Sequence, residues 1–167
     1  MPLKLLIIAH LLADFIFQPT KLIEWKKRHF LGVIVHVLIF ALLALILLAP
    51  FLIYWETWVV VAAVSLVHFL TDKLKISLLK KYDEYMLPFI VDQLVHLGSI
   101  VIGAQFIPKV EFIISDYLIA GFLLGIYIIY IFFIIYLQKA KSKRLIKVKI
   151  AAFTVVFAVF FAIALLM

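Results

Sequence analysis

Residues 3–18 read LKLLIIAHLLADFIFQ, an apolar run in which a histidine, an aspartate and a glutamine follow one another at intervals of four. A spanning helix needs about 17–25 mostly apolar residues, so the run is just long enough to cross a membrane. In a helix, His10, Asp14 and Gln18 stack on one face. Ionisable side chains inside a span cost free energy and usually face the bundle interior or a functional path. The stretch therefore predicts a membrane helix with a polar site on one face.

The composition of the whole chain also indicates an integral membrane protein. The chain has 68% hydrophobic residues, 15% charged residues and a mean hydropathy of +1.28, whereas soluble domains are about half apolar. Cysteine is absent, which excludes disulfides, thiolate ligands and covalently attached haem. The net charge of +7 comes from basic clusters between apolar runs, as topology signals do. We therefore expect the lipid bilayer, and no nucleic acid, as a partner.

Six apolar runs predict an all-α, polytopic bundle of six spans, at about residues 3–18, 30–50, 57–76, 88–107, 117–138 and 150–167. Five spans with a re-entrant first run are the alternative. Residues 1–107 are expected to form a four-helix core that bears the polar site, and residues 108–167 two further apolar spans for packing or dimerisation. Residues 21–28 mix apolar and charged side chains, which favours a short amphipathic helix on the membrane surface over a plain polar turn.

The distribution of basic residues predicts the orientation. The first, third and fifth connections hold four, four and six Lys or Arg, fourteen of the chain's sixteen. Under the positive-inside rule these connections are cytoplasmic and both termini lie outside. The expected location is the cytoplasmic membrane.

Two more histidine–aspartate pairs share the spacing of His10 and Asp14. His68 precedes Asp72, and Asp92 precedes His96 on a span that runs in the opposite direction. All three pairs then place the carboxylate nearer the cytoplasm and the imidazole deeper. His36 lies at a similar depth in the second span. Four histidines and three carboxylates thus converge from four helices.

This set of side chains is typical of a divalent metal site. Mixed nitrogen and oxygen ligands without sulfur suit zinc first, with manganese or iron as alternatives. The seven candidates exceed one tetrahedral shell, so either two ions share the carboxylates or some residues support the ligands. The competing interpretation is that these residues are hydrogen-bonding partners between helices. The predicted metal ligands are His10, Asp14, His36, His68, Asp72, Asp92 and His96.

Other polar residues have weaker signals. His36 is either a ligand or a general base, and Gln18 and Gln93 are helix-end hydrogen bonders, supports for ligands or donors to a substrate. Thr71 is expected to bond to its own helix backbone, and His29 to be solvated. Two small-residue pairs, Ser99 with Gly103 and Gly121 with Gly125, permit close helix contact within the bundle or across a homodimer.

These motifs resemble a known family. The blocks HLLADFIFQ (residues 10–18), His36, HFLTDKLK (residues 68–75) and DQLVH (residues 92–96) are similar to the signature of the prokaryotic multispanning family called domain of unknown function 3307, over roughly residues 5–100. The resemblance implies no established activity. More distantly, the polar residues resemble those of membrane-bound metal-dependent hydrolases.

The expected function is that of a membrane-embedded, metal-dependent hydrolase. The substrate would be an amphiphilic phosphoester or lipid-linked molecule at the cytoplasmic face. One alternative is a divalent-cation or proton translocator, but the polar residues stop halfway across the bilayer. A second alternative is a haem protein with two histidines as axial ligands, which leaves the carboxylates without a role.

Overall fold

The structure of the protein is a computed structural model. It describes residues 1–81, 86–109, 121 and 123–131, together with residues 150, 151, 154, 155, 157–159, 161 and 162. The chain forms two compact units, Met1–Phe112 and Ile113–Met167. The first unit contains all of the predicted site residues.

Helices are the only regular secondary structure in the described part of the first unit. Its elements are α1 (Pro2–Leu11), a π-helical turn (Leu12–Ile16), α2 (Thr20–Arg28), α3 (Phe30–Leu47), a 3-10 turn (Ala49–Phe51), α4 (Trp55–Lys81) and α5 (Met86–Ala104). Proline marks several boundaries, since it fixes φ and lacks an N–H donor. Pro2 begins α1, Pro19 precedes α2 in an extended conformation, and Pro50 lies in the turn that follows α3.

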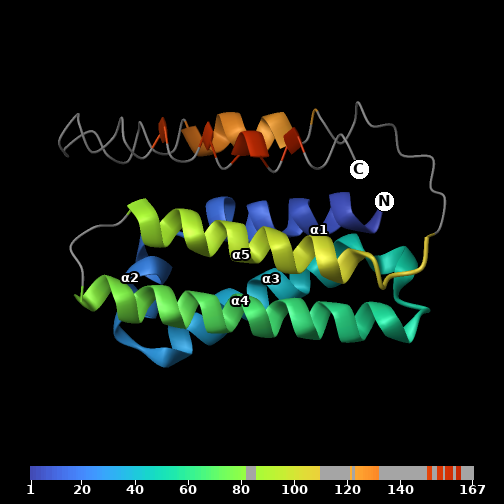
Figure 1. Cartoon of the computed structure of the whole chain (residues 1–167), viewed down its shortest axis with the longest axis horizontal. Coiled ribbons are helices and arrows are strands. Elements are labelled where there is room, and N and C mark those ends of the chain that lie inside the picture. Colours follow the sequence, from blue (N-terminus) through green and yellow to red (C-terminus); the bar gives the residue numbers. More distant parts are fainter. Residues whose placement is uncertain are drawn as a thin grey trace. The chain divides into compact units, whose positions relative to one another are not determined.

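The four long helices pack in an antiparallel arrangement. α4 packs against α3 and α5, and α1 packs against α3 and α5. Figure 1 shows that α1 and α4 run in one direction and α3 and α5 in the other. Gly103 permits the close contact of α5 with α4, because a Cβ there would lie 3.0 Å from side-chain atoms of Val60 and Val64. The predicted close contact at the Ser99–Gly103 pair is therefore made within the bundle.

Helix α2 turns sharply away from α1, at 88°. It is the amphipathic helix predicted over residues 21–28. Its approach to α3 depends on Gly32, where an added Cβ would lie 2.5 Å from the backbone nitrogen of Lys26. One residue differs from the expected pattern: Lys26 is buried beside Leu22, four residues earlier, while Trp25 is 39% exposed.

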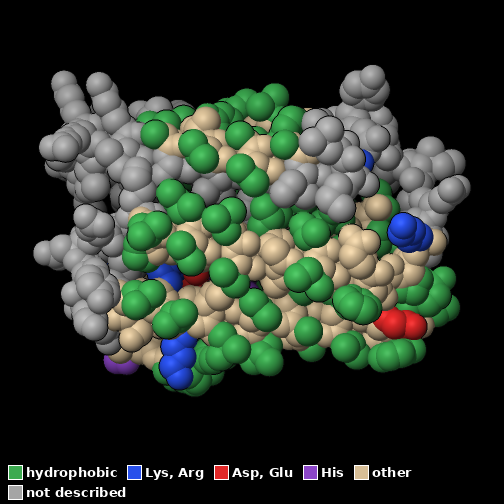
Figure 2. All heavy atoms as spheres, viewed as in Figure 1, with side chains coloured by type: hydrophobic (Ala, Val, Ile, Leu, Met, Phe, Trp, Pro, Cys, Tyr) green, Lys and Arg blue, Asp and Glu red, His purple; other side chains and the backbone are tan. Residues whose placement is uncertain are grey.

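Among the described residues, two helical segments are long and apolar enough to cross a membrane, Phe30–Leu47 and Leu87–Ala104. A third is added if the bent pair Pro2–Ile16 and Thr20–Arg28 counts as one span. Exposed leucines and isoleucines line the outer faces of α3, α4 and α5, among them Leu38, Leu42, Ile46, Leu66, Leu70, Leu94 and Ile102. In Figure 2, hydrophobic side chains spread over the face of α4 and α5, whereas charged side chains lie toward the two ends. Such a continuous apolar surface is typical of contact with lipid.

The all-α prediction is confirmed for the described residues. The sequence predicts six spans, whereas the described residues contain two or three helices that are long and apolar enough to span a membrane. α4 has 27 residues but carries Asp72, Lys73 and Lys75 in its second half. Most of the run at residues 117–138, the basic connection at 139–149 and much of the last run lie outside the described residues.

Candidate metal centre

Four histidines from four helices meet in the interior of the first unit. His10 lies on α1, His36 on α3, His68 on α4 and His96 on α5, and each is at most 1% exposed. The rings of His68 and His96 stack with centroids 4.0 Å apart, and those of His36 and His68 are 4.9 Å apart. The ring of His10 is 5.0 Å from that of His96. Phe40 stacks on the ring of His68 and forms an apolar wall.

Asp14 reaches this cluster from a π-helical turn. The N–H of Phe17 donates to the carbonyl oxygen of Leu12 at 2.8 Å, a bond that spans five residues. Such turns insert an extra residue into a helix and are frequent at functional sites. The side chain of Asp14 is 6% exposed, and its Oδ1 atom makes no hydrogen bond to any described residue.

Three atoms form a compact triangle at the centre of the cluster. The Nε2 atoms of His36 and His68 are 2.9 Å apart, and Oδ1 of Asp14 lies 3.2 Å from the first and 3.4 Å from the second. Ligand atoms at about 2.0–2.1 Å from a tetrahedral zinc ion are roughly 3.3–3.4 Å from one another. The triangle therefore has nearly the size of one face of a zinc coordination shell.

Asp72 lies beside this triangle and is also held by lysine. Its Oδ2 is 3.4 Å from Nε2 of His36 and accepts a 2.6 Å hydrogen bond from Lys26. Its Oδ1 is 2.8 Å from Nζ of Lys75, which also donates to Oδ2 of Asp92. The lysines thus link α2, α4 and α5 through buried ion pairs.

The two glutamines contact the histidines and carboxylates directly. The amide nitrogen of Gln18 is 2.9 Å from Nδ1 and 3.0 Å from Nε2 of His36. Gln93 bonds to Nε2 of His10 through its oxygen, and its nitrogen donates to Asp14 and Asp92, each at 3.2 Å. All seven predicted ligands and both glutamines therefore lie in one connected network.

Two weaker expectations are also met, and one contact is new. The hydroxyl of Thr71 bonds to its own helix at the carbonyl oxygen of Val67, as expected, and also contacts Nε2 of His96 at 2.6 Å. His29 is exposed. Sequence reasoning missed the roles of Lys26 and Lys75, which it assigned to the basic clusters. Lys26 follows Leu22 by four residues, and this helical spacing was the available signal that it is buried.

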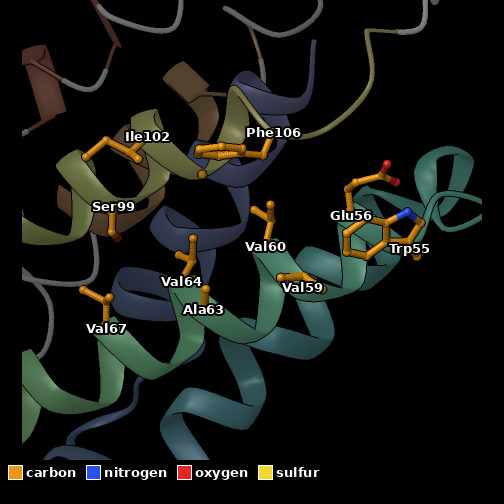
Figure 3. A pocket seen from close by; sticks show the side chains of 11 residues that line it. Trp55, Glu56, Val59, Val60, Ala63, Val64, Val67, Ser99, Ile102 and Phe106 are labelled. Carbon is orange, nitrogen blue, oxygen red and sulfur yellow. The ribbon is translucent and has the colours of Figure 1, made fainter.

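A separate apolar groove of about 440 Å³ runs along the outer side of α4 and α5. Figure 3 shows Val67 and Ser99 at one end and Trp55 and Glu56 at the other. Val67 precedes His68, and Ser99 bonds to the carbonyl oxygen of His96. One end of the groove thus adjoins the helix segments that carry two of the histidines.

A family model described as "Protein of unknown function (DUF3307)" matches residues 3–122. The matched segment includes every residue of the network. Neither a curated protein nor a solved structure matches the chain.

Proposed function

Since the chain belongs to the DUF3307 family of proteins of unknown function, its activity has to be inferred from the site, and we propose that it is a membrane-embedded, metal-dependent hydrolase. The observation that carries this proposal is the triangle formed by Nε2 of His36, Nε2 of His68 and Oδ1 of Asp14. These three atoms would hold one divalent ion. Zinc is the first candidate, with manganese or iron as alternatives.

The charges of the network support a bound cation. With neutral imidazoles, three buried carboxylates and two lysines leave one negative charge uncompensated. An uncompensated buried charge is costly. A divalent ion at the triangle that carries one hydroxide would bring the net charge from −1 to zero.

The surrounding side chains would orient the ligands. Gln18 lies beside both ring nitrogens of His36, and its amide can turn to accept a proton from Nδ1 when Nε2 binds a metal. Lys26 and Lys75 hold Asp72 in place next to the triangle. Asp72 is then a fourth ligand or a support for His36.

A bound divalent ion supplies a Lewis acid and lowers the pKa of a bound water toward about 7. We propose a phosphoester as the substrate. Its hydrolysis joins the water oxygen to phosphorus and breaks the ester P–O bond, and the leaving alcohol takes up a proton. Gln93 would orient the carboxylates of Asp14 and Asp92, to which its amide nitrogen donates.

The apolar groove supports an amphiphilic substrate. Its lining is almost wholly hydrophobic, and one end adjoins the helix turns of His68 and His96. A hydrocarbon chain would lie in this groove while the phosphoryl group is at the metal.

We further propose that the site faces the cytoplasm and that the chain has six spans with both termini outside. The basic residues of α2 and the second half of α4 lie at the same end of the bundle as Asp14 and Asp72, since Lys26 contacts Asp72 and Lys73 lies over Phe30. The positive-inside rule places this end in the cytoplasm.

The test is phosphate release from a long-chain alkyl phosphate by the detergent-purified protein supplied with Zn²⁺ or Mn²⁺. We expect metal-dependent release that falls by about a hundredfold or more in His68→Ala, because a catalytic ion contributes several kcal/mol. The exposed His29 provides the control, and His29→Ala should keep full activity. Absence of phosphate release together with Zn²⁺ uptake into sealed vesicles would replace the hydrolase with a cation translocator, and a coloured preparation with a haem spectrum would replace it with a haem protein.

A further inference from the structure

His10 is held in a single tautomer by Gln93. The amide nitrogen of Gln93 lies 3.2 Å from a carboxylate oxygen of Asp14 and 3.2 Å from one of Asp92. Ionised carboxylates only accept hydrogen bonds, so the NH₂ group must face them and the amide oxygen must face Nε2 of His10, at 3.2 Å. An amide oxygen only accepts, so Nε2 of a neutral His10 carries the proton. Its lone pair is then on Nδ1.

His96 is held in the same tautomer by Thr71. The single hydroxyl proton of Thr71 is donated to a backbone carbonyl, that of Val67 at 2.8 Å. The hydroxyl oxygen therefore accepts from Nε2 of His96 at 2.6 Å. The lone pair of His96 is on Nδ1, which is buried and makes no hydrogen bond to any described residue.

Both Nδ1 atoms lie near carboxylate oxygens. Nδ1 of His10 is 3.7 Å from Oδ1 of Asp14, and Nδ1 of His96 is 3.8 Å from Oδ2 of Asp92. Electron-rich atoms this close together in a buried site are stabilised by a cation between or beside them. In addition, one ligand atom from each of His10, Asp14, His68 and His96 lies within 4.8 Å of the other three.

We propose that Nδ1 of His10 and Nδ1 of His96 bind a second divalent ion, with Asp14 shared between this ion and the first. This inference rests on the proposed metal site of His36, His68 and Asp14. It assigns Gln93 and Thr71 as positioning residues, since each fixes the protonation of a ligand without touching the ion. Support of this kind is common for metal-bound histidines.

The second ion also narrows the substrate class. Two divalent ions with three carboxylates and two lysines bring the network to a net charge of +3. A phosphate monoester dianion and one hydroxide balance that charge. Two-metal sites of this kind clamp the attacking and leaving oxygens of a phosphoryl group, so the substrate class is an amphiphilic phosphate monoester.

The test uses the full-length protein in detergent, stripped of metal and titrated with Mn²⁺, with elemental analysis and electron paramagnetic resonance as readouts. We expect two Mn²⁺ per chain and a spin-coupled signal. His96→Ala should retain one Mn²⁺ with an uncoupled six-line signal. Thr71→Val should lower the affinity for the second Mn²⁺ by about 10–100-fold and leave the affinity for the first unchanged.

Ser99→Ala is the matched control, because the Ser99 hydroxyl bonds to the backbone of His96 and not to its ring. It should bind two Mn²⁺ like the wild type. One uncoupled Mn²⁺ per wild-type chain would overturn the second site and leave the first standing, whereas no bound Mn²⁺ would overturn both. The wild-type stoichiometry decides the question even if a variant fails to fold.

Discussion

The Nε2 atoms of His36 and His68 lie 2.9 Å apart although the two residues come from different helices, α3 and α4. Both side chains are almost fully buried, at 0% and 1% exposure. Two imidazole nitrogens at this distance either share one proton or bind one ion. The carboxylate of Asp14, close to both nitrogens, favours the ion.

Replacement of Lys26 by methionine should destabilise the fold. The variant leaves the carboxylate of Asp72 with only one of its two lysines, and removal of one partner of a buried ion pair costs about 3–5 kcal/mol. The expected loss of stability is at the lower end of this range because Lys75 still contacts Asp72. Denaturant unfolding in detergent measures it. Lys27 is exposed, and Lys27→Met is the control; equal stabilities of the two variants would contradict the buried ion pair.

Replacement of Gly32 by alanine should displace α2 from α3. The new Cβ would lie 2.5 Å from a backbone nitrogen that cannot move alone, and overpacking of this kind costs about 1–3 kcal/mol. Gly98→Ala is the matched control, since a Cβ there meets nothing within 4 Å of it among the described residues, and alanine stabilises a helix relative to glycine by about 1 kcal/mol. The midpoint temperature of thermal unfolding should therefore fall in Gly32→Ala and rise in Gly98→Ala. A similar decrease in both would argue against the close α2–α3 contact.

Sequence patterns predicted the family, the all-α class and the side chains that meet in the interior, because polar residues at four-residue intervals in apolar runs are conspicuous. The match over residues 3–122 confirms the family. The pattern did not predict the π-helical turn at Asp14, since no side chain in LADFI demands it. It also missed Lys26 and Lys75, because a basic residue near a span end serves equally as a topology signal or as a buried partner. Only the tertiary packing separates these two roles, because it brings Lys26 of α2 to Asp72 of α4 and Lys75 of α4 to Asp92 of α5.

The groove can be tested with two neighbouring alanines on α4. Ala63 lines the groove, whereas Ala62 is exposed outside it. Ala63→Phe should fill part of the groove and raise the KM for a long-chain alkyl phosphate by about tenfold or more, since each excluded CH₂ forfeits about 0.8 kcal/mol. It should not change the KM for a short-chain phosphate. Equal effects of Ala62→Phe and Ala63→Phe on the KM for the long-chain substrate would show that its alkyl chain binds outside the groove.

The proposed orientation can be tested by cysteine labelling, because the natural chain has no cysteine. Ile53, 85% exposed in the connection between α3 and α4, and Lys27 on α2 lie on opposite sides of the membrane in the proposed topology. A membrane-impermeant maleimide should label Ile53→Cys in intact cells and Lys27→Cys only after permeabilisation. The reverse pattern would place the metal centre at the outer face.

The most direct test of the metal centre is elemental analysis of the protein purified without added metal or chelator. We expect zinc, manganese or iron at one or two ions per chain, with loss of the ion at the triangle in His36→Ala and His68→Ala and full retention in His29→Ala. If the folded wild-type protein binds no such metal, even after incubation with Zn²⁺ or Mn²⁺, the proposal of a metal centre is wrong. The four histidines and three aspartates then form only a hydrogen-bonded network between helices.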